Sequence, residues 1–286
     1  MAGASRRAIL ATITAAAAAV PFALARRAPQ REAVEELLHV SSTSDLYASN
    51  TELYSTAGVA EGTDYARRYK RHEQFDDSAA QKFPFTKTAI IAPHGGGIEA
   101  GTSELCLAVA GYDPKDLAAT PAGGPAHDYW MFEGIRSSNN AELHVTSTHC
   151  DDGVALAFAA GSRNALGLHG CSTTAAGLPD GTQAALVGGR SGTFKQYLIQ
   201  ELTAAGFQAI DAASNEALKG EDPENIANRT LVGAGGQLEI TTPLRAAMFG
   251  TNTIAQRKNT TTAVFWSFTA AIRTAIARLE ADQVIL

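Results

Sequence analysis

Short apolar runs alternate with longer amphipathic segments along most of the chain, from residue 86 onward. An apolar run of about four to eight residues bounded by turn residues is typical of a buried strand, whereas apolar residues at three- and four-residue intervals indicate a helix. On this basis strands are predicted at residues 88–93, 142–148, 164–169, 183–189, 207–212 and 235–241, and helices at 103–112, 153–161, 193–206 and 261–281.

The last predicted helix shows its pattern clearly, because Phe265, Phe268, Ile272, Ile276 and Leu279 fall on one face. Strands that alternate with helices predict an α/β fold in which helices cover both faces of a central sheet. In such sheets the functional groups gather at the carboxyl ends of the strands. The strand ends are therefore the place to look for chemistry.

The first 60 residues have a different organisation. Residues 1–25 carry Arg6 and Arg7, then an alanine-rich apolar run that ends in Ala-Leu-Ala, which is typical of an export signal and resembles the twin-arginine type. An uncleaved membrane anchor is the alternative, although the run is barely long enough to span a bilayer. We predict an irregular N-terminal extension over 26–59 and a domain that carries the chemistry over 60–286.

The charge of the chain limits its partners. Of 286 residues 45% are hydrophobic, which suits one large domain, and the formal net charge is -6. Removal of residues 1–25 takes away two arginines and no acids, so the charge falls to -8. An acidic protein of this kind is not expected to bind nucleic acid or an anionic membrane surface. No stretch after residue 25 is apolar enough to span a bilayer, so stable membrane insertion after signal cleavage is not expected either.

The cysteines, Cys106, Cys150 and Cys171, are too few for a disulfide framework. Export permits one bridge. Cys150 and Cys171 lie just beyond His149 and His169. If those strand ends adjoin, either a disulfide between the two cysteines or a pair of buried free thiols is expected.

The polar residues at three strand ends point to a metal site. His94, His149 and His169 each close or follow a predicted strand, and imidazole is the commonest metal ligand. Glu99 follows His94 after a run of three glycines, which allow the backbone to turn so that the carboxylate returns beside the imidazole. Two histidines and one glutamate leave a fourth position open, the usual arrangement of a catalytic zinc ion. The residues alone leave His149 and His169 as alternatives for the second histidine.

A phosphate-binding loop is the competing interpretation of this glycine run. The segment lacks the lysine of G-x-x-x-x-G-K-[ST], and it fails G-x-G-x-x-G because Ala100 stands where the third glycine belongs. Glu99 and Glu104 would also repel a phosphate group. The glycine run therefore fits a metal site better than a phosphate loop.

A second acidic residue, Glu239, lies in the apolar strand of residues 235–241. Side chains alternate along a strand, so Glu239 faces away from Leu238 and Ile240. It is either an ordinary solvent-facing residue or a general base or acid beside a metal-bound water.

Five segments in this order, "PHGGGIEAGTSEL", "FEGIRSSNNAELHVTSTH", "LGLHGC", "VGGR" and "GGQLEITTPLR", resemble the poly-γ-glutamate hydrolase family, which is similar in fold to the zinc carboxypeptidases. The resemblance covers residues 60–282. It implies a three-layer α/β/α fold with a mixed central sheet.

The resemblance also implies roles for individual residues. His94, Glu99 and His169 would hold Zn²⁺, and Glu239 would be the general base. The spacing departs from the carboxypeptidases, which have H-x-x-E where this chain has four residues between His94 and Glu99. His149 would then lie behind the ligands or on the substrate.

The polymer that this family cleaves carries a carboxylate on every residue, and arginine binds carboxylates well. Arg136 and Arg229 are the candidates by position.

Together these features predict a secreted zinc-dependent amidohydrolase, exported by a twin-arginine-like signal, that cleaves γ-glutamyl amide bonds in an acidic polymer or peptide, most simply poly-γ-glutamate. A cell-wall peptidase or amidase that cuts γ-glutamyl bonds of peptidoglycan is the alternative. A secreted binding protein that kept the fold and lost catalysis is the alternative from another class, against which the intact set of candidate residues speaks.

Overall fold

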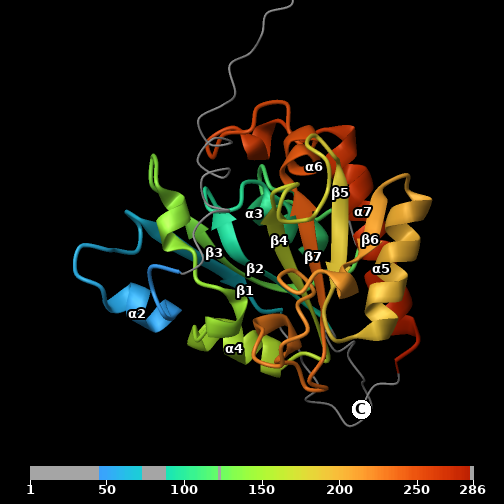
Figure 1. The fold of residues 1–286 in the computed structure, drawn as a ribbon, viewed down its shortest axis with the longest axis horizontal. Helices are drawn as coiled ribbons and strands as arrows, with labels where there is room; N and C mark the ends of the chain where they lie inside the picture. The colour runs from blue at the N-terminus through green and yellow to red at the C-terminus, as the bar shows by residue number, and fades with distance from the viewer. Residues whose placement is uncertain (1–44, 73–87, 122–123, 284–286) are drawn as a thin grey trace, which may run out of the picture.

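The computed structural model of the chain describes residues 45–72, 88–121 and 124–283 (Figure 1). Its centre is a seven-stranded sheet in the order β1-β3-β2-β4-β7-β5-β6. The pairs β3–β2, β2–β4, β4–β7 and β5–β6 are parallel, whereas β1–β3 and β5–β7 are antiparallel. The strands are β1 (Tyr65–Lys70), β2 (Thr88–Gly96), β3 (Asp128–Gly134), β4 (Asn164–Cys171), β5 (Ala184–Gly188), β6 (Gln208–Asp211) and β7 (Gly236–Thr241).

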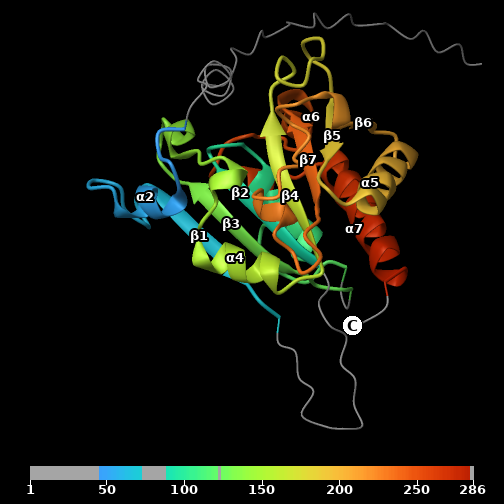
Figure 2. The same cartoon turned by 60° about the horizontal axis from the view of Figure 1, so that its bottom comes forward.

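Helices lie on both sides of this sheet (Figure 2). They are α2 (Asn50–Ser55), α3 (Thr102–Ala110), α4 (Gly153–Ala160), α5 (Gly192–Ala204), α6 (Thr242–Ala247) and α7 (Ala263–Ala281), with single turns η1 (Asn140–Leu143), η2 (Ser147–His149), η3 (Ala212–Ser214), η4 (Ile226–Asn228) and η5 (Arg257–Asn259).

Successive residues of β2 show the two layers directly. Ile90 and Ala92 pack in the cluster that contains α3, α5 and α7, while Ala89 and Ile91 pack in the cluster that contains α2 and α4. A strand that is apolar on both faces reads as a continuous hydrophobic run, as β2 does. The predicted three-layer α/β/α fold with a mixed sheet is confirmed.

The sequence pattern missed two strands, β1 and β3. Among the described strands, β1 is an edge strand that pairs only with β3. Its basic residues bind acids: Arg67 pairs with Glu61 and with the buried Asp152, and Arg68 pairs with Glu133. Its polar composition is typical of an edge strand and hides the strand pattern.

The strand predicted at residues 142–148 is wrong. The segment instead consists of η1, an extended link and η2. Leu143 and Val145 do alternate into the core, but the backbone groups that a strand would use are taken by side chains. The N–H of Thr146 donates to Asp45, and the carbonyl of Val145 faces Nε2 of His94.

The N-terminal part of the chain is described only from residue 45. The predicted export signal at 1–25 and most of the predicted extension lie outside the described residues. Residues 45–59 hold α2, and Tyr47 and Leu53 are buried against the sheet. Within the described ranges, no helix combines the length and apolar character that crossing a membrane requires.

All three cysteines, Cys106, Cys150 and Cys171, are free and buried. Of the two expectations for Cys150 and Cys171, the structure has the free thiols.

The glycine run between His94 and Glu99 lets two strands approach closely. Gly96 has a φ of +66°, and a β-carbon on it would collide with the backbone oxygen of Gly134 in β3. The next N–H, of Gly97, donates to the same oxygen at 2.9 Å. The run therefore allows a turn and also a backbone contact that no larger residue permits.

We predict that Gly96→Ala destabilises the protein much more than Gly58→Ala. Gly58 also has a positive φ, +88°, but open space surrounds it. Gly58→Ala should cost about 1–2 kcal/mol of unfolding free energy for the strained backbone. Gly96→Ala should add about 1–3 kcal/mol for the displaced strand. Urea unfolding of both variants measures the difference, and equal losses would contradict the close-approach argument.

Candidate active site

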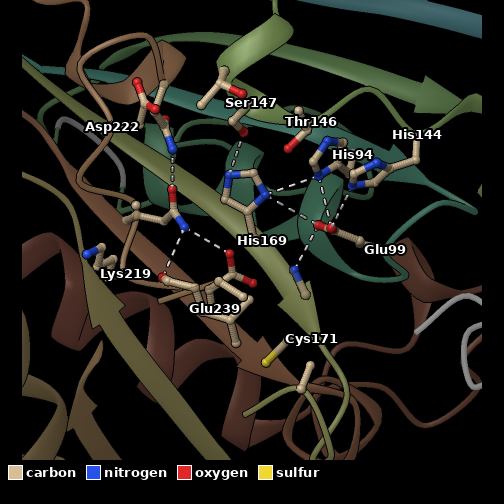
Figure 3. Close-up of a pocket in the computed structure, with 18 of the residues that line it drawn as sticks. His94, Glu99, His144, Thr146, Ser147, His169, Cys171, Lys219, Asp222 and Glu239 are labelled. Carbon is tan, nitrogen blue, oxygen red and sulfur yellow. Dashed lines mark hydrogen bonds and ion pairs between the residues drawn. The ribbon is translucent and has the colours of Figure 1, made fainter. Parts of the chain in front are cut away.

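A pocket of about 870 Å³ opens at the carboxyl ends of β2, β4 and β7 (Figure 3). Its walls come from His94 on β2, the segment around Ser147, His169 on β4, the loop of residues 216–222, and Glu239 on β7. Three of the four residues predicted for the catalytic zinc site, His94, His169 and Glu239, thus reach the pocket from three strands. Glu99, the fourth, also lines it.

His94, Glu99 and His169 face one another at short distances. Nδ1 of His94 lies 2.9 Å from Oε1 of Glu99 and 3.1 Å from Nδ1 of His169. Nδ1 of His169 lies 3.7 Å from Oε2 of Glu99. All three side chains are buried. Two imidazole nitrogens and one carboxylate therefore converge on a single small volume.

The hydrogen bonds decide which atoms of these rings carry protons. Nε2 of His94 lies 2.8 Å from the carbonyl oxygen of Val145, which can only accept, so this nitrogen carries a hydrogen. In the neutral ring Nδ1 is then a lone pair that faces another acceptor, Oε1 of Glu99. That contact is favourable only if a proton or a metal ion lies between the two atoms. Behind His169, the hydroxyl of Ser147 contacts Nε2 at 3.2 Å.

This arrangement fits a divalent metal ion. Metal-ligating histidines characteristically bond through one nitrogen and donate the other N–H to a carbonyl or hydroxyl group, as His94 and His169 can do here. Burial lowers the pKa of His169 to about 3, which keeps its imidazole neutral and available as a ligand. Burial alone would also lower the pKa of His94, but the adjacent Glu99 carboxylate outweighs burial and raises it.

His144 is a further histidine at this site, and the sequence analysis missed it. Its ring stacks on that of His94 with centroids 3.9 Å apart, and its Nε2 lies 3.9 Å from Oε1 of Glu99. Ligand atoms of His94, Glu99 and His144 all lie within 4.8 Å of one another. His144 belongs to a segment that had been predicted as a strand, and no strand end marked it.

Asp45 fixes the orientation of His144 from the N-terminal side. Its Oδ1 lies 2.6 Å from Nδ1 of His144, and its Oδ2 accepts from the N–H of Thr146 at 2.6 Å. A carboxylate can only accept, so Nδ1 of His144 carries the hydrogen. Nε2 is the ring nitrogen on the side of Glu99. Sequence reasoning gave no signal for Asp45, which lies 99 residues away in the chain.

Glu239 lies beside these groups on the neighbouring strand. It is register-paired with His169 across the β4–β7 ladder and is 7% exposed. Burial, together with the charge of Glu99, raises its pKa well above the usual range of a glutamate. Because the side chain is buried, the alternative of a solvent-facing strand residue is wrong.

The three residues predicted to bind substrate do not line the pocket. The Arg136 guanidinium pairs with Asp64 at 2.7 Å and with Glu142 at 3.0 Å. Arg229 pairs with Glu224. His149 is exposed at the end of η2, a short turn that carries it away from the strand edge where it was expected. Of the two histidines that the sequence left open, only His169 reaches Glu99.

The chain resembles known proteins over most of its length. A model of the poly-gamma-glutamate hydrolase family matches residues 60–271. The chain is 34% identical over 186 residues to the SPbeta prophage-derived protein YoqZ of Bacillus subtilis (strain 168), which covers 65% of this chain and 60% of YoqZ. It is 32% identical over 180 residues to YndL of the same organism, covering 63% of each chain. The chain thus spans less than two thirds of the length of either relative.

Two solved structures have the same fold. A bacteriophage poly-gamma-glutamate hydrolase superimposes with a TM-score of 0.68 at 28% identity, covering 84% of this chain and 100% of that chain. A zinc-free apo structure of YndL superimposes with a TM-score of 0.66 at 28% identity, covering 82% and 99% of the two chains. Since the family model matches well over half of the sequence, the protein belongs to the poly-γ-glutamate hydrolase family and has its carboxypeptidase-like fold.

Proposed function

We propose that this protein is a zinc-dependent amidohydrolase that cleaves γ-glutamyl amide bonds, with poly-γ-glutamate as its substrate. The observation that carries the proposal is the convergence of His94, Glu99, His169 and Glu239 on one pocket in a chain of this family. The export signal predicted at residues 1–25 supports a secreted enzyme, for which a polymer outside the cell is the accessible substrate.

Zinc is the proposed metal because the donor set is two imidazoles and one carboxylate, and because the relative YndL has a zinc-free apo form, which implies a zinc-bound one. His94 and His169 would bind through Nδ1, and Glu99 through its carboxylate. Zinc held there would supply Lewis acidity for the scissile carbonyl. His144, less buried and stacked on His94, is proposed to face the substrate.

Glu239 is proposed to move the proton. A carboxylate beside the metal site can take a proton from the attacking water and return it to the leaving amine. The raised pKa of Glu239 favours holding that proton between the two steps. Its place on β7, next to His169 on β4, puts it at the edge of the proposed metal site.

Lys219 replaces the two arginines as the proposed partner of a substrate carboxylate. Among the described residues it is the only lysine or arginine that lines the pocket. It pairs with Glu216 at 2.6 Å, but Glu216 is 83% exposed, so this ion pair contributes little and a substrate carboxylate can replace it.

The pocket wall also supports the second candidate function. Glu216, Glu221 and Asp222 line the same wall as Lys219, which makes that wall acidic. A γ-glutamyl peptide of the cell wall that carries an amino group would suit it better than a polyanion. Comparing hydrolysis of poly-γ-glutamate and of a peptidoglycan peptide separates the two candidates, and no turnover of either would favour the binding-protein alternative.

We predict that His169→Ala weakens zinc binding and that His149→Ala does not. Removing one of three protein ligands should weaken the affinity about 100-fold or more, since losing even a residue that orients a ligand costs about 10–100-fold. The affinity is measured by competition with a chelator. His149→Ala is the matched control, because His149 is exposed outside the pocket. Equal affinities in the two variants would exclude His169 as a ligand, and the same assay on His144→Ala shows whether His144 takes its place.

We predict that Glu239→Gln retains zinc and loses turnover. The amide keeps the shape of the side chain but cannot accept a proton, and losing general acid–base catalysis typically costs about 10²–10⁴-fold in rate. Zinc content is measured alongside kcat. A variant with normal kcat would remove Glu239 from the mechanism.

We predict that Lys219→Met raises KM for poly-γ-glutamate about 10-fold with little change in kcat, because it removes a binding contact equally from the ground and transition states. Lys258→Met is the control for charge, since Lys258 is exposed and does not line the pocket. Equal effects of the two variants would mean that Lys219 acts only through the net charge of the protein.

A further inference from the structure

Among the described residues, one neighbour holds the carboxylate of Glu239. In the described part of the chain, its one hydrogen bond comes from Nε2 of Gln237, which donates to Oε1 at 2.8 Å. Gln237 and Glu239 are two residues apart on β7, so their side chains leave the same face of the sheet. Gln237 is 4% exposed, and neither the sequence motifs nor the proposed mechanism accounts for it.

A chain of hydrogen bonds fixes which end of the Gln237 amide faces Glu239. The N–H of Ala227 donates to Oδ1 of Asn225 at 3.0 Å, so the other end of the Asn225 side chain is its NH₂ group. That group donates to Oε1 of Gln237 at 2.8 Å, which turns Nε2 of Gln237 toward Glu239. Amide orientations are assigned from such networks, and here a backbone N–H that can only donate determines the direction at its start.

The contacts at the other end of this hydrogen-bond series require the same orientation of the Gln237 amide. Nε2 of Gln237 also faces the carbonyl oxygen of Leu218 at 3.4 Å, a group that can only accept. Gly220 packs against the amide, and a β-carbon there would lie 2.6 Å from Oε1 of Gln237. The amide is therefore enclosed and cannot flip without leaving buried groups unpaired, which is costly.

We propose that Gln237 is a positioning residue for Glu239, held in its donating orientation by Asn225. The inference rests on the proposed role of Glu239. Gln237 fixes Oε1 and thereby the plane of the carboxylate, so that Oε2 is presented to the attacking water in one orientation. A general base must lie within hydrogen-bond reach of the proton that it takes, and a displacement of about 1 Å can cost about 100-fold in rate.

The test is Asn225→Asp, a substitution at a residue that does not touch Glu239. An aspartate can only accept at both oxygens, so Gln237 has to turn its NH₂ group toward residue 225. Its carbonyl oxygen then faces Glu239 and the carbonyl of Leu218, and both hydrogen bonds are lost. We expect kcat on poly-γ-glutamate to fall by up to about 100-fold, with bound zinc within about 2-fold of wild type. Because Asn225 lines the pocket, the added charge also raises KM for the polyanion, so kcat is the deciding readout.

Asn228→Asp is the matched control, because Asn228 is equally buried in the same segment but contacts Gly220 and Asp222 instead of Gln237. It should lower thermal stability with a much smaller effect on the kcat of folded protein. If both aspartate variants lose kcat equally, the loss comes from a general disturbance of this loop and not from Gln237, and the proposal is overturned.

Gln237→Met tests the same idea if Asn225→Asp does not fold, since it keeps the length of the side chain and removes the donor. Normal kcat in Gln237→Met would overturn the positioning role. Glu239→Gln is measured in parallel. If Glu239→Gln is inactive while Asn225→Asp and Gln237→Met are fully active, the proposed function stands and the positioning role of Gln237 is wrong. If Glu239→Gln is active, the proposed role of Glu239 itself fails.

Discussion

The buried carboxylate of Glu99 is the group on which the rest of the site depends. A buried charge is tolerated only where partners compensate for lost hydration. Glu99 has these partners from three parts of the fold: His94 on β2, the N–H of Gly170 at 2.8 Å and Nδ1 of His169 on β4, and His144 before η2. Because one carboxylate needs all of them, the strand ends and the segment between β3 and α4 are held in a single arrangement.

On the other side of the pocket, buried polar side chains of β7 also depend on partners from another part of the fold. Leu238 and Ile240 join the apolar layer with α3, α5 and α7, while Gln237 and Glu239 on the opposite face are buried and polar. A strand with one apolar and one polar buried face needs partners on both. The polar partners come from residues 218–227, which link β6 to β7 and form one wall of the pocket. The shape of the cavity and the orientation of the glutamate thus have a common structural origin.

The pattern of the sequence predicts much of this fold, and what it misses has physical causes. Apolar runs identify β2, β4, β5 and β7 because these strands are buried on both faces. His94, Glu99 and His169 were accessible to sequence reasoning because strand ends and a glycine run mark them. His144 could not be found in this way, because the backbone groups of its segment bond to the side chains of Asp45 and His94 and form no strand. Arg136 and Arg229 show the converse. Their place along the sequence suggested a position near the site, but Arg136 pairs with Asp64 and Glu142, and Arg229 pairs with Glu224.

The contact between Asp45 and His144 joins the pocket to a residue that lies before the segment matched by the family model. The family model matches from residue 60, yet a side chain 15 positions before that point sets the tautomer of a histidine in the pocket. Trimming or swapping the chain at residue 60 would thus remove Asp45 from His144 and would also uncover the apolar side chains of the sheet that Tyr47 and Leu53 cover. The residues that shape the pocket therefore extend beyond the segment that the family model matches.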